Sequence, residues 1–343
     1  MITVYADDHR LHRGLLDPRG ETWRASSECP ERADNVVKAI REQRFGTVIE
    51  PDQFDDAPIT RIHTADYLEF LKNVWPEWLA SDEQGANARP ETFVGPGMRH
   101  VESDCIAGKL GRYSFDSTTP FVEGSFKAIR TSANIALTAA GLLQDGQRHA
   151  FALCRPPGHH ATQDCCGGYC YLNNTALAAQ KLLDGGAGPV AVLDVDYHHG
   201  NGTQTIFYER SDVLTISLHA DPKLEYPFFA GFADETGAGN GRGYNYNYPL
   251  PFGTDWASYQ AVLDEALDGI RRFSPAVLLV ALGLDTFVGD PTTHFAITTD
   301  DFRRMGERIA TLALPTLVVL EGGYSVEHIG ENTVNFLKGL AAK

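Results

Sequence analysis

Short apolar runs alternate with amphipathic stretches along most of the chain. Apolar runs of strand length occur at 1–6, 150–154, 190–195, 213–218, 277–282 and 316–320. Stretches of helical pattern lie between or after them, at 125–143, 174–183, 203–208, 256–273 and 302–313. Strands that alternate with helices indicate βαβ crossovers, which build a mainly parallel sheet flanked by helices. We therefore predict one α/β domain over residues 1–343.

Two further helices are expected near the N-terminus, followed by a long segment without periodicity. One helix starts at Pro30, and a second carries His63, Tyr67 and Leu71 on one face. Between residues 81 and 124 the pattern fades, and glycines and acidic residues recur. Long segments of this kind are uncommon in compact domains and are usually functional. We interpret 81–124 as an insert near the site or at an oligomer interface; a surface excursion is the alternative.

Composition and charge narrow the class of protein. The 43% hydrophobic and 22% charged residues are ordinary for a globular protein, and no apolar run reaches the ~18 residues of a membrane helix. A net charge of −16 argues against a nucleic-acid partner and suits a cationic small molecule. The early polar residues do not fit a signal peptide. Six cysteines without a Cys-x-x-Cys pair indicate reduced thiols and a cytoplasmic location.

The run at 190–195 ends in a group of residues that suits a metal ion. Asp194, Asp196 and His198 are spaced i, i+2, i+4, so an extended backbone directs all three to one side. Two carboxylates and an imidazole at the end of a buried strand need a cation, and these ligands suit zinc or a neighbouring first-row ion. An Asp-x-Asp pair after a strand also occurs in magnesium phosphotransferases, where the first Asp is the nucleophile.

Three other predicted strands also end in reactive residues. His159 and His160 follow one strand, and Asp285 and Tyr324 follow two others. Ligands of parallel sheets bind beyond the carboxyl ends of the strands, so these groups are expected to meet there. Asp196, His198 and Asp285 would give a metal three protein ligands and leave open positions, as in catalytic zinc sites.

The remaining groups predict an amide hydrolysis site. His159 and His160 suit a division of labour, one accepting the proton of a metal-bound water and the other protonating the leaving group. Asp194 and Asn201 are candidates to accept the distal N–H groups of these histidines. Tyr324 follows two glycines and suits donation to an oxyanion. Metal-assisted hydrolysis of an amide is the reaction that these groups favour together.

Five motifs in this order resemble the histone deacetylase family. They are the Pro-Pro-Gly-His-His run at 156–160, Gly-Gly-Tyr-Cys-Tyr-Leu-Asn-Asn at 167–174, the run at 193–203, Gly-Leu-Asp-Thr-Phe at 283–287 and Glu-Gly-Gly-Tyr at 321–324. The chain looks most like bacterial acetylpolyamine amidohydrolases, because of its length, its Tyr226-Pro227 loop and the 81–124 insert. The resemblance implies a three-layer arginase–deacetylase fold and one zinc ion on Asp196, His198 and Asp285.

The resemblance also implies roles and partners for individual residues. His159 would be the general base, His160 the acid and Tyr324 the oxyanion donor. Tyr169 and Tyr226, with the glycine motif that begins at Gly167, would wall the substrate tunnel. Structural potassium ions are implied at two sites, whose side chains or carbonyls come from Asp194, Ser217 and Leu218 and from Phe207, Arg210 and Val213. The insert would build a homodimer and supply acidic groups to distal amines.

Two positions depart from the family pattern. Many members have Asp where Asn201 stands, so the neutral partner is expected to lower the pKa of His160. Thr118 stands where polyamine-type members carry Glu, which leaves Asp116 as the nearest acidic substitute for substrate binding.

The sequence thus predicts a zinc amidohydrolase that removes acetyl groups from N-acetylated polyamines or related cationic amines. An acetyl-lysine deacetylase with the same chemistry is the alternative. A non-catalytic module that binds an acetylated ligand would require a broken site, and no expected catalytic residue is missing. A manganese ureohydrolase would need further Asp ligands for a second metal, which the sequence does not offer.

Overall fold

A computed structural model describes residues 1–14, 16–19, 22–82 and 85–342. Its centre is one eight-stranded sheet in which every neighbouring pair is parallel. From edge to edge the strands are β4 (Thr47–Ile49), β1 (Ile2–Val4), β5 (His149–Ala152), β10 (Thr316–Leu320), β9 (Val277–Leu282), β6 (Val190–Asp194), β7 (Val213–Ala220) and β8 (Asn245–Leu250). The predicted α/β class with a parallel sheet is confirmed.

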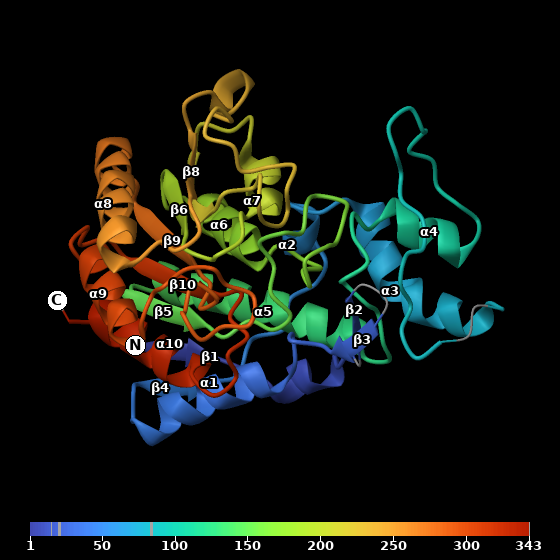
Figure 1. Cartoon of the computed structure of the whole chain (residues 1–343), viewed down its shortest axis with the longest axis horizontal. Coiled ribbons are helices and arrows are strands. Elements are labelled where there is room, and N and C mark those ends of the chain that lie inside the picture. The colour runs from blue at the N-terminus through green and yellow to red at the C-terminus, as the bar shows by residue number, and fades with distance from the viewer. Residues whose placement is uncertain (15, 20–21, 83–84, 343) are drawn as a thin grey trace.

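Helices cover both faces of the sheet and make a three-layer arrangement (Figure 1). One face packs against α3 (Ala65–Ala80), α5 (Ser125–Gln144) and α6 (Asn174–Asp184). The other packs against α1 (Glu31–Glu42), α8 (Trp256–Phe273), α9 (Thr299–Ala310) and α10 (Ile329–Leu340). Alternation along the strands feeds both cores, since Leu317 and Val319 belong to the first and Val318 and Leu320 to the second.

The smaller elements connect or extend these layers. They are the short helices α2 (Ala57–Thr60), α4 (Ile106–Arg112) and α7 (Asn201–Phe207), two 3₁₀ turns at Asp7–Leu11 and Gly239–Gly241, and an antiparallel hairpin of β2 (Leu16–Arg19) and β3 (Thr22–Ala25). No helix among the described residues is long and apolar enough to span a bilayer.

The insert at 81–124 contains α4 as its regular element within its described residues, 81–82 and 85–124. It lies beside α3 at one end of the molecule (Figure 1). Ala88 forms a bridge with Phe121, and Ser114 forms one with Cys166. The first bridge lies within the insert, and the second joins the insert to the segment just before the Gly167–Tyr169 turn. Part of the insert therefore lies next to the predicted site.

The structure corrects the predicted elements at several places. The loop with the glycine cluster at 237–243 leads into an additional edge strand, β8, which was not predicted. His63 lies in a turn before α3 rather than inside the helix, although it is buried with Tyr67 and Leu71. The strand β4, the β2–β3 hairpin and the helices α2 and α10 also lie outside the prediction.

Candidate active site at the carboxyl edge of the sheet

The four strands that precede the candidate residues are neighbours in the sheet. Their order is β5, β10, β9, β6, although they are far apart in the chain. All run parallel, so the segments that follow them leave the same edge. The structure therefore brings His159, Asp196, Asp285 and Tyr324 to one rim from four separate parts of the sequence.

Asp196, His198 and Asp285 form a compact group of metal-ligand type. One potential ligand atom from each lies within 4.8 Å of the other two. His198 Nδ1 lies 3.1 Å from Asp285 Oδ2 and 3.4 Å from Asp196 Oδ1. Both carboxylates are fully buried, and backbone N–H groups hold them, with Gly322 N donating to Asp196 Oδ2 at 2.8 Å and Tyr197 N to Asp285 Oδ1 at 2.9 Å.

The electrostatics of this group fit a divalent cation. Burial and the charge of Asp196 raise the pKa of Asp285 to about 7, even though His198 lies beside it. Two carboxylates at this depth repel each other unless positive charge lies between them. The backbone also leaves room for close approach, because a Cβ on Gly322 would lie 2.3 Å from Asp285 Oδ2 and 2.5 Å from Asp196 Oδ2. The donor set Asp, His, Asp suits zinc.

The paired histidines lie next to this group, and each is held by a hydrogen bond at its Nδ1. His159 Nδ1 is 3.0 Å from Asp194 Oδ2, and His160 Nδ1 is 2.7 Å from Asn201 Oδ1. The two ring centroids are 4.0 Å apart. His159 Nε2 lies 3.8 Å from Asp196 Oδ1, so the free nitrogen of this ring faces the metal-ligand group.

The two histidines differ in their electrostatic surroundings. Burial alone would lower the pKa of His159, but the charges of Asp196 and Asp194 raise it to about 10. Burial and the nearby His159 lower the pKa of His160 well below its usual value, whereas the hydrogen bond to Asn201 raises it. The low pKa expected for His160 is present, but burial is its main cause.

Tyr324 reaches the site on a loop that two charged residues fix. Its backbone N–H donates to Asp290 Oδ2 at 2.5 Å, and the N–H of Ser325 donates to the same oxygen at 2.9 Å. Arg32 donates to the carbonyl oxygens of Glu321 and Gly323, and its guanidinium lies 4.8 Å from the centre of the Tyr324 ring. Burial keeps the pKa of Tyr324 well above its usual value, so its hydroxyl remains protonated.

Glu321 is a buried site residue that the sequence reasoning missed. Its Oε2 accepts from the backbone N–H groups of Gly158 and His159 at 2.6 and 3.0 Å, and its Oε1 accepts from the Thr175 hydroxyl at 2.9 Å. Burial raises its pKa to about 7. The sequence signal that could have identified Glu321 is its position, directly after the last strand and before Gly322. Asp290 and Arg32 were missed because the groups around Tyr324 that they hold are backbone groups of a distant segment.

A cavity of about 350 Å³ opens onto the site. It is lined by Thr118, His160, Gly168, Tyr169, His198, Glu225, Tyr226, Pro291, Thr292, His294 and Tyr324. The Tyr226 ring meets His160 edge-on at 5.0 Å, and Tyr169 lies 5.8 Å from Tyr324 between ring centres. Tyr169 and Tyr226 therefore lie where walls of a substrate tunnel were expected.

Asp116 and Gly167 do not line this cavity. Asp116 Oδ2 accepts from the N–H of Gly168 at 2.7 Å and from the Tyr226 hydroxyl at 2.6 Å, while its Oδ1 accepts from Thr118. Asp116 thus lies behind the Tyr226 wall and fixes it, instead of offering a carboxylate to a ligand in the cavity. Gly167 packs against the Phe115 ring, which a Cβ there would meet at 2.2 Å.

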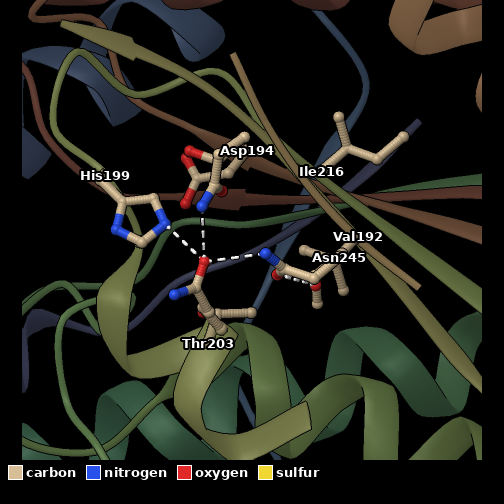
Figure 2. A pocket seen from close by; sticks show the side chains of 11 residues that line it. Val192, Asp194, His199, Thr203, Ile216 and Asn245 are labelled. Atoms are coloured by element: carbon tan, nitrogen blue, oxygen red, sulfur yellow. Dashed lines mark hydrogen bonds between the residues drawn. The ribbon is translucent and has the colours of Figure 1, made fainter. Parts of the chain in front are cut away.

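The residues expected at potassium sites lie on β6, α7 and β7 and in the turn between α7 and β7. Asp194 and Ser217 are direct neighbours in the β6–β7 register, and both line a cavity of about 10 Å³ (Figure 2). His199 and Asn245 approach the same space, where both bond the amide oxygen of Gln204. Leu218 follows on β7; Phe207 ends α7, Arg210 lies in the next turn and Val213 begins β7.

Comparison with known proteins defines the class. The histone deacetylase domain matches residues 26–340, so the chain belongs to the histone deacetylase family, and its fold is the arginase–deacetylase α/β fold. Within that family it is 49% identical over 339 residues to acetylpolyamine amidohydrolase 2 of Pseudomonas aeruginosa, covering 99% of this chain and 98% of that protein. It is 41% identical to the acetylpolyamine amidohydrolase of Mycoplana ramosa, over 99% of this chain and all of that one.

A solved structure extends this similarity to three dimensions. The acetylpolyamine aminohydrolase of Burkholderia pseudomallei superimposes with a TM-score of 0.94 at 43% identity, covering 100% of this chain and 99% of that one. The whole chain, including the 81–124 insert, therefore has a counterpart in a relative of nearly the same length.

Proposed function

We propose that this protein is a zinc-dependent amidohydrolase that deacetylates N-acetylated polyamines or related cationic acetyl-amines. The observation that carries the proposal is the group Asp196, His198 and Asp285 beside the paired histidines, at the end of a cavity that Tyr324 also lines. The full-length similarity to proteins named acetylpolyamine amidohydrolases supports the choice of substrate.

The metal-ligand group would hold one zinc ion, which supplies Lewis-acid polarisation of the amide carbonyl and of a water molecule. His159 has its Nδ1 engaged by Asp194, so its Nε2 is free to accept the proton of the attacking water. Positive charge bound by Asp196 and Asp285 disfavours protonated His159, which keeps this nitrogen available.

The other groups complete the cleavage of the carbon–nitrogen bond. The Tyr324 hydroxyl donates to the oxygen that becomes negative as the carbonyl carbon is attacked. His160 is assigned to deliver a proton to the departing amine nitrogen, which then leaves as a neutral amine; because the lowered pKa keeps His160 itself neutral, the proton that His159 has taken from the water closes the balance. The products are acetate and the free amine, and the aromatic walls Tyr169 and Tyr226 hold the aliphatic part of the substrate.

Further parts of the proposal concern ions, assembly and location. Asp194, Ser217 and Leu218, and separately Phe207, Arg210 and Val213, would hold structural potassium through side-chain or carbonyl oxygens. A homodimer is supported by apolar side chains near the cavity mouth, where Phe229 is 91% and Leu224 57% exposed. A cytoplasmic location is supported by the six cysteines, all of which are free thiols.

Acetate release by the zinc-loaded protein tests the proposal. N-acetylputrescine, N-acetylspermidine and an acetyl-lysine peptide should be offered in parallel, with the metal-stripped protein as control. We expect turnover of the acetylated amines and its loss on chelation. Turnover of the peptide alone would favour the acetyl-lysine deacetylase alternative, and no turnover of any substrate would return the binding-module hypothesis.

A further inference from the structure

Glu225 stands apart among the residues that line the cavity. The lining comprises the reacting groups, two threonines, aromatic rings and Pro291, and Glu225 alone among them carries a carboxylate. Neither lysine nor arginine lines the cavity, and none of the three lining histidines, His160, His198 and His294, forms an ion pair with Glu225. A carboxylate that faces a partly enclosed space without a counter-ion favours a cationic ligand.

Hydrogen bonds fix the position of this carboxylate. Glu225 Oε1 accepts from the backbone N–H of Tyr226 at 3.0 Å, and Oε2 accepts from the Tyr197 hydroxyl at 3.1 Å. The Tyr197 ring in turn packs edge-on against His198 at 5.0 Å and Phe295 at 4.8 Å between centres. Each carboxylate oxygen has capacity for a further donor, so the bonds to Tyr226 and Tyr197 leave room for an ammonium group.

The neighbouring rings connect Glu225 to the reacting end of the cavity. Tyr226, the next residue, lies 5.0 Å from His160 and 6.1 Å from His198 between ring centres. Its ring face can contact the methylene chain of a substrate or support an ammonium group through a cation–π interaction. A linear substrate with its amide at His198 therefore passes Tyr226 on its way toward Glu225.

The acidic residue of the insert does not offer an equivalent contact. Asp116 is engaged by Gly168, Tyr226 and Thr118, and Thr118 itself presents only a hydroxyl to the cavity. The carboxylate that lines the cavity is thus Glu225, in the loop that carries Tyr226 after β7, and not Asp116 of the insert.

We propose that Glu225 is a specificity-determining residue that binds the free ammonium group of an acetylated diamine or polyamine. This inference rests on the proposed deacetylase function and specifies how that site distinguishes charged from neutral acetyl-amines. The ammonium group takes the place of a missing counter-ion, and the loss of the Glu225 charge weakens substrate binding more than the chemical step.

A matched pair of substrates tests the inference. N-acetylputrescine carries a terminal ammonium, and N-pentylacetamide has a methyl group in its place. We expect Glu225→Gln, which keeps an acceptor for Tyr197 and Tyr226, to lower the kcat/KM ratio of the first to the second by about tenfold or more. The change should fall on KM for N-acetylputrescine, and kcat/KM for N-pentylacetamide should stay within about twofold.

Two variants control for charge and for structure. Asp234→Asn removes the same charge from an exposed position of the same loop and should leave the ratio unchanged. Glu225→Asp keeps the charge and should retain the preference for the charged substrate. Equal losses on both substrates in Glu225→Gln and Glu225→Asp would show a purely structural role and overturn the inference.

The outcomes separate this inference from the proposed function. If the wild-type protein hydrolyses N-acetylputrescine and Glu225→Gln leaves the ratio unchanged, the inference fails while the deacetylase function stands. If the zinc-loaded wild-type protein hydrolyses no acetylated amine, the proposed function fails and the role of Glu225 fails with it.

Discussion

The protonation of the two site histidines depends on the residue that each bonds through Nδ1. His159 and His160 are chemically identical, yet one has a carboxylate behind it and the other an amide oxygen. The surroundings of the protein alone raise the pKa of His159 and lower that of His160, and a cation bound by Asp196 and Asp285 would counter the raised value and leave His159 available as the base. The proton inventory of the site is therefore set by Asp194, Asn201 and burial.

Replacing Tyr324 with Phe tests the oxyanion donor. The variant keeps the ring that packs near Tyr169 and Arg32 but loses the hydroxyl. We expect kcat for N-acetylputrescine to fall by about 10²–10³-fold with little change in KM, because the lost bond forms mainly in the transition state. Tyr246→Phe, at a tyrosine that is 40% exposed, serves as a control and should leave kcat unchanged.

Asp290 is expected to act through Tyr324, which a double-mutant cycle can measure. Its carboxylate holds the N–H groups of Tyr324 and Ser325, and its other oxygen holds Thr292 at the cavity lining. Asp290→Ala should lower kcat by about tenfold or more in the wild type and by much less in the Tyr324→Phe background. Equal losses in both backgrounds would mean that Asp290 supports the fold generally.

Prediction from the sequence succeeded for single residues where the signal was local. His159, Asp196, Asp285 and Tyr324 each lie within a few residues of the end of an apolar run, so the strand pattern located them. Glu225 lies in the middle of a loop, where no periodic pattern marks it. Glu321 did follow a strand, but its partners Gly158 and His159 come from another strand end and depend on the order of the sheet.

At the scale of elements, the loops after the strands are as constrained as the strands themselves. The turn after β10 passes so close to the metal-ligand carboxylates that it has no space for a side chain at Gly322. The buried elements β5, β6, β9 and β10 were predicted because their sequences are continuously apolar. The strand β8 was not, because its Asn-Tyr-Asn-Tyr-Pro-Leu sequence is that of a half-exposed edge strand.

Gly322→Ala is expected to weaken zinc binding. A methyl group there would lie 2.3 and 2.5 Å from carboxylate oxygens of Asp285 and Asp196, so at least one ligand must move. Zinc affinity measured by competition with a chromophoric chelator should fall by about tenfold or more, in line with other disturbances of groups around a metal. Gly269→Ala, in α8 with its nearest neighbour at 3.6 Å, should retain wild-type affinity.

At the scale of the whole molecule, buried neutral histidines make the fold sensitive to acid. Burial is the main cause that lowers the pKa to about 4 for His9, His12, His63 and His219. The unfolded chain binds protons on these residues near pH 6.5, whereas the folded chain does so only near pH 4. The contribution of these four histidines to the free energy of unfolding therefore decreases as the pH falls from about 6.5 toward 4.

His63 allows a direct test of this acid sensitivity. Its Nε2 accepts a hydrogen bond from the backbone N–H of Asn173 at 2.9 Å. Protonation of Nε2 would place an N–H of the ring opposite the N–H of Asn173, and this hydrogen bond would be lost. The shift to about 4 corresponds to about 3 kcal/mol of stability lost between pH 6.5 and 4. Urea unfolding of His63→Gln at pH 7, 6 and 5 should show a shallower pH dependence than the wild type; parallel curves would contradict the assignment.

The position of β10 has a consequence for biosynthesis. Of the strands of this sheet it is the last to be synthesised, yet it lies between β5 and β9 in the middle of the sheet. Without β10 the strand order leaves two separate groups, β4-β1-β5 and β9-β6-β7-β8, with the paired histidines after a strand of one and the metal-ligand group after strands of the other. Assembly of the site thus depends on this strand, and a polypeptide truncated before Thr316 would retain Asp196, His198 and Asp285 but lack the strand that joins them to the paired histidines.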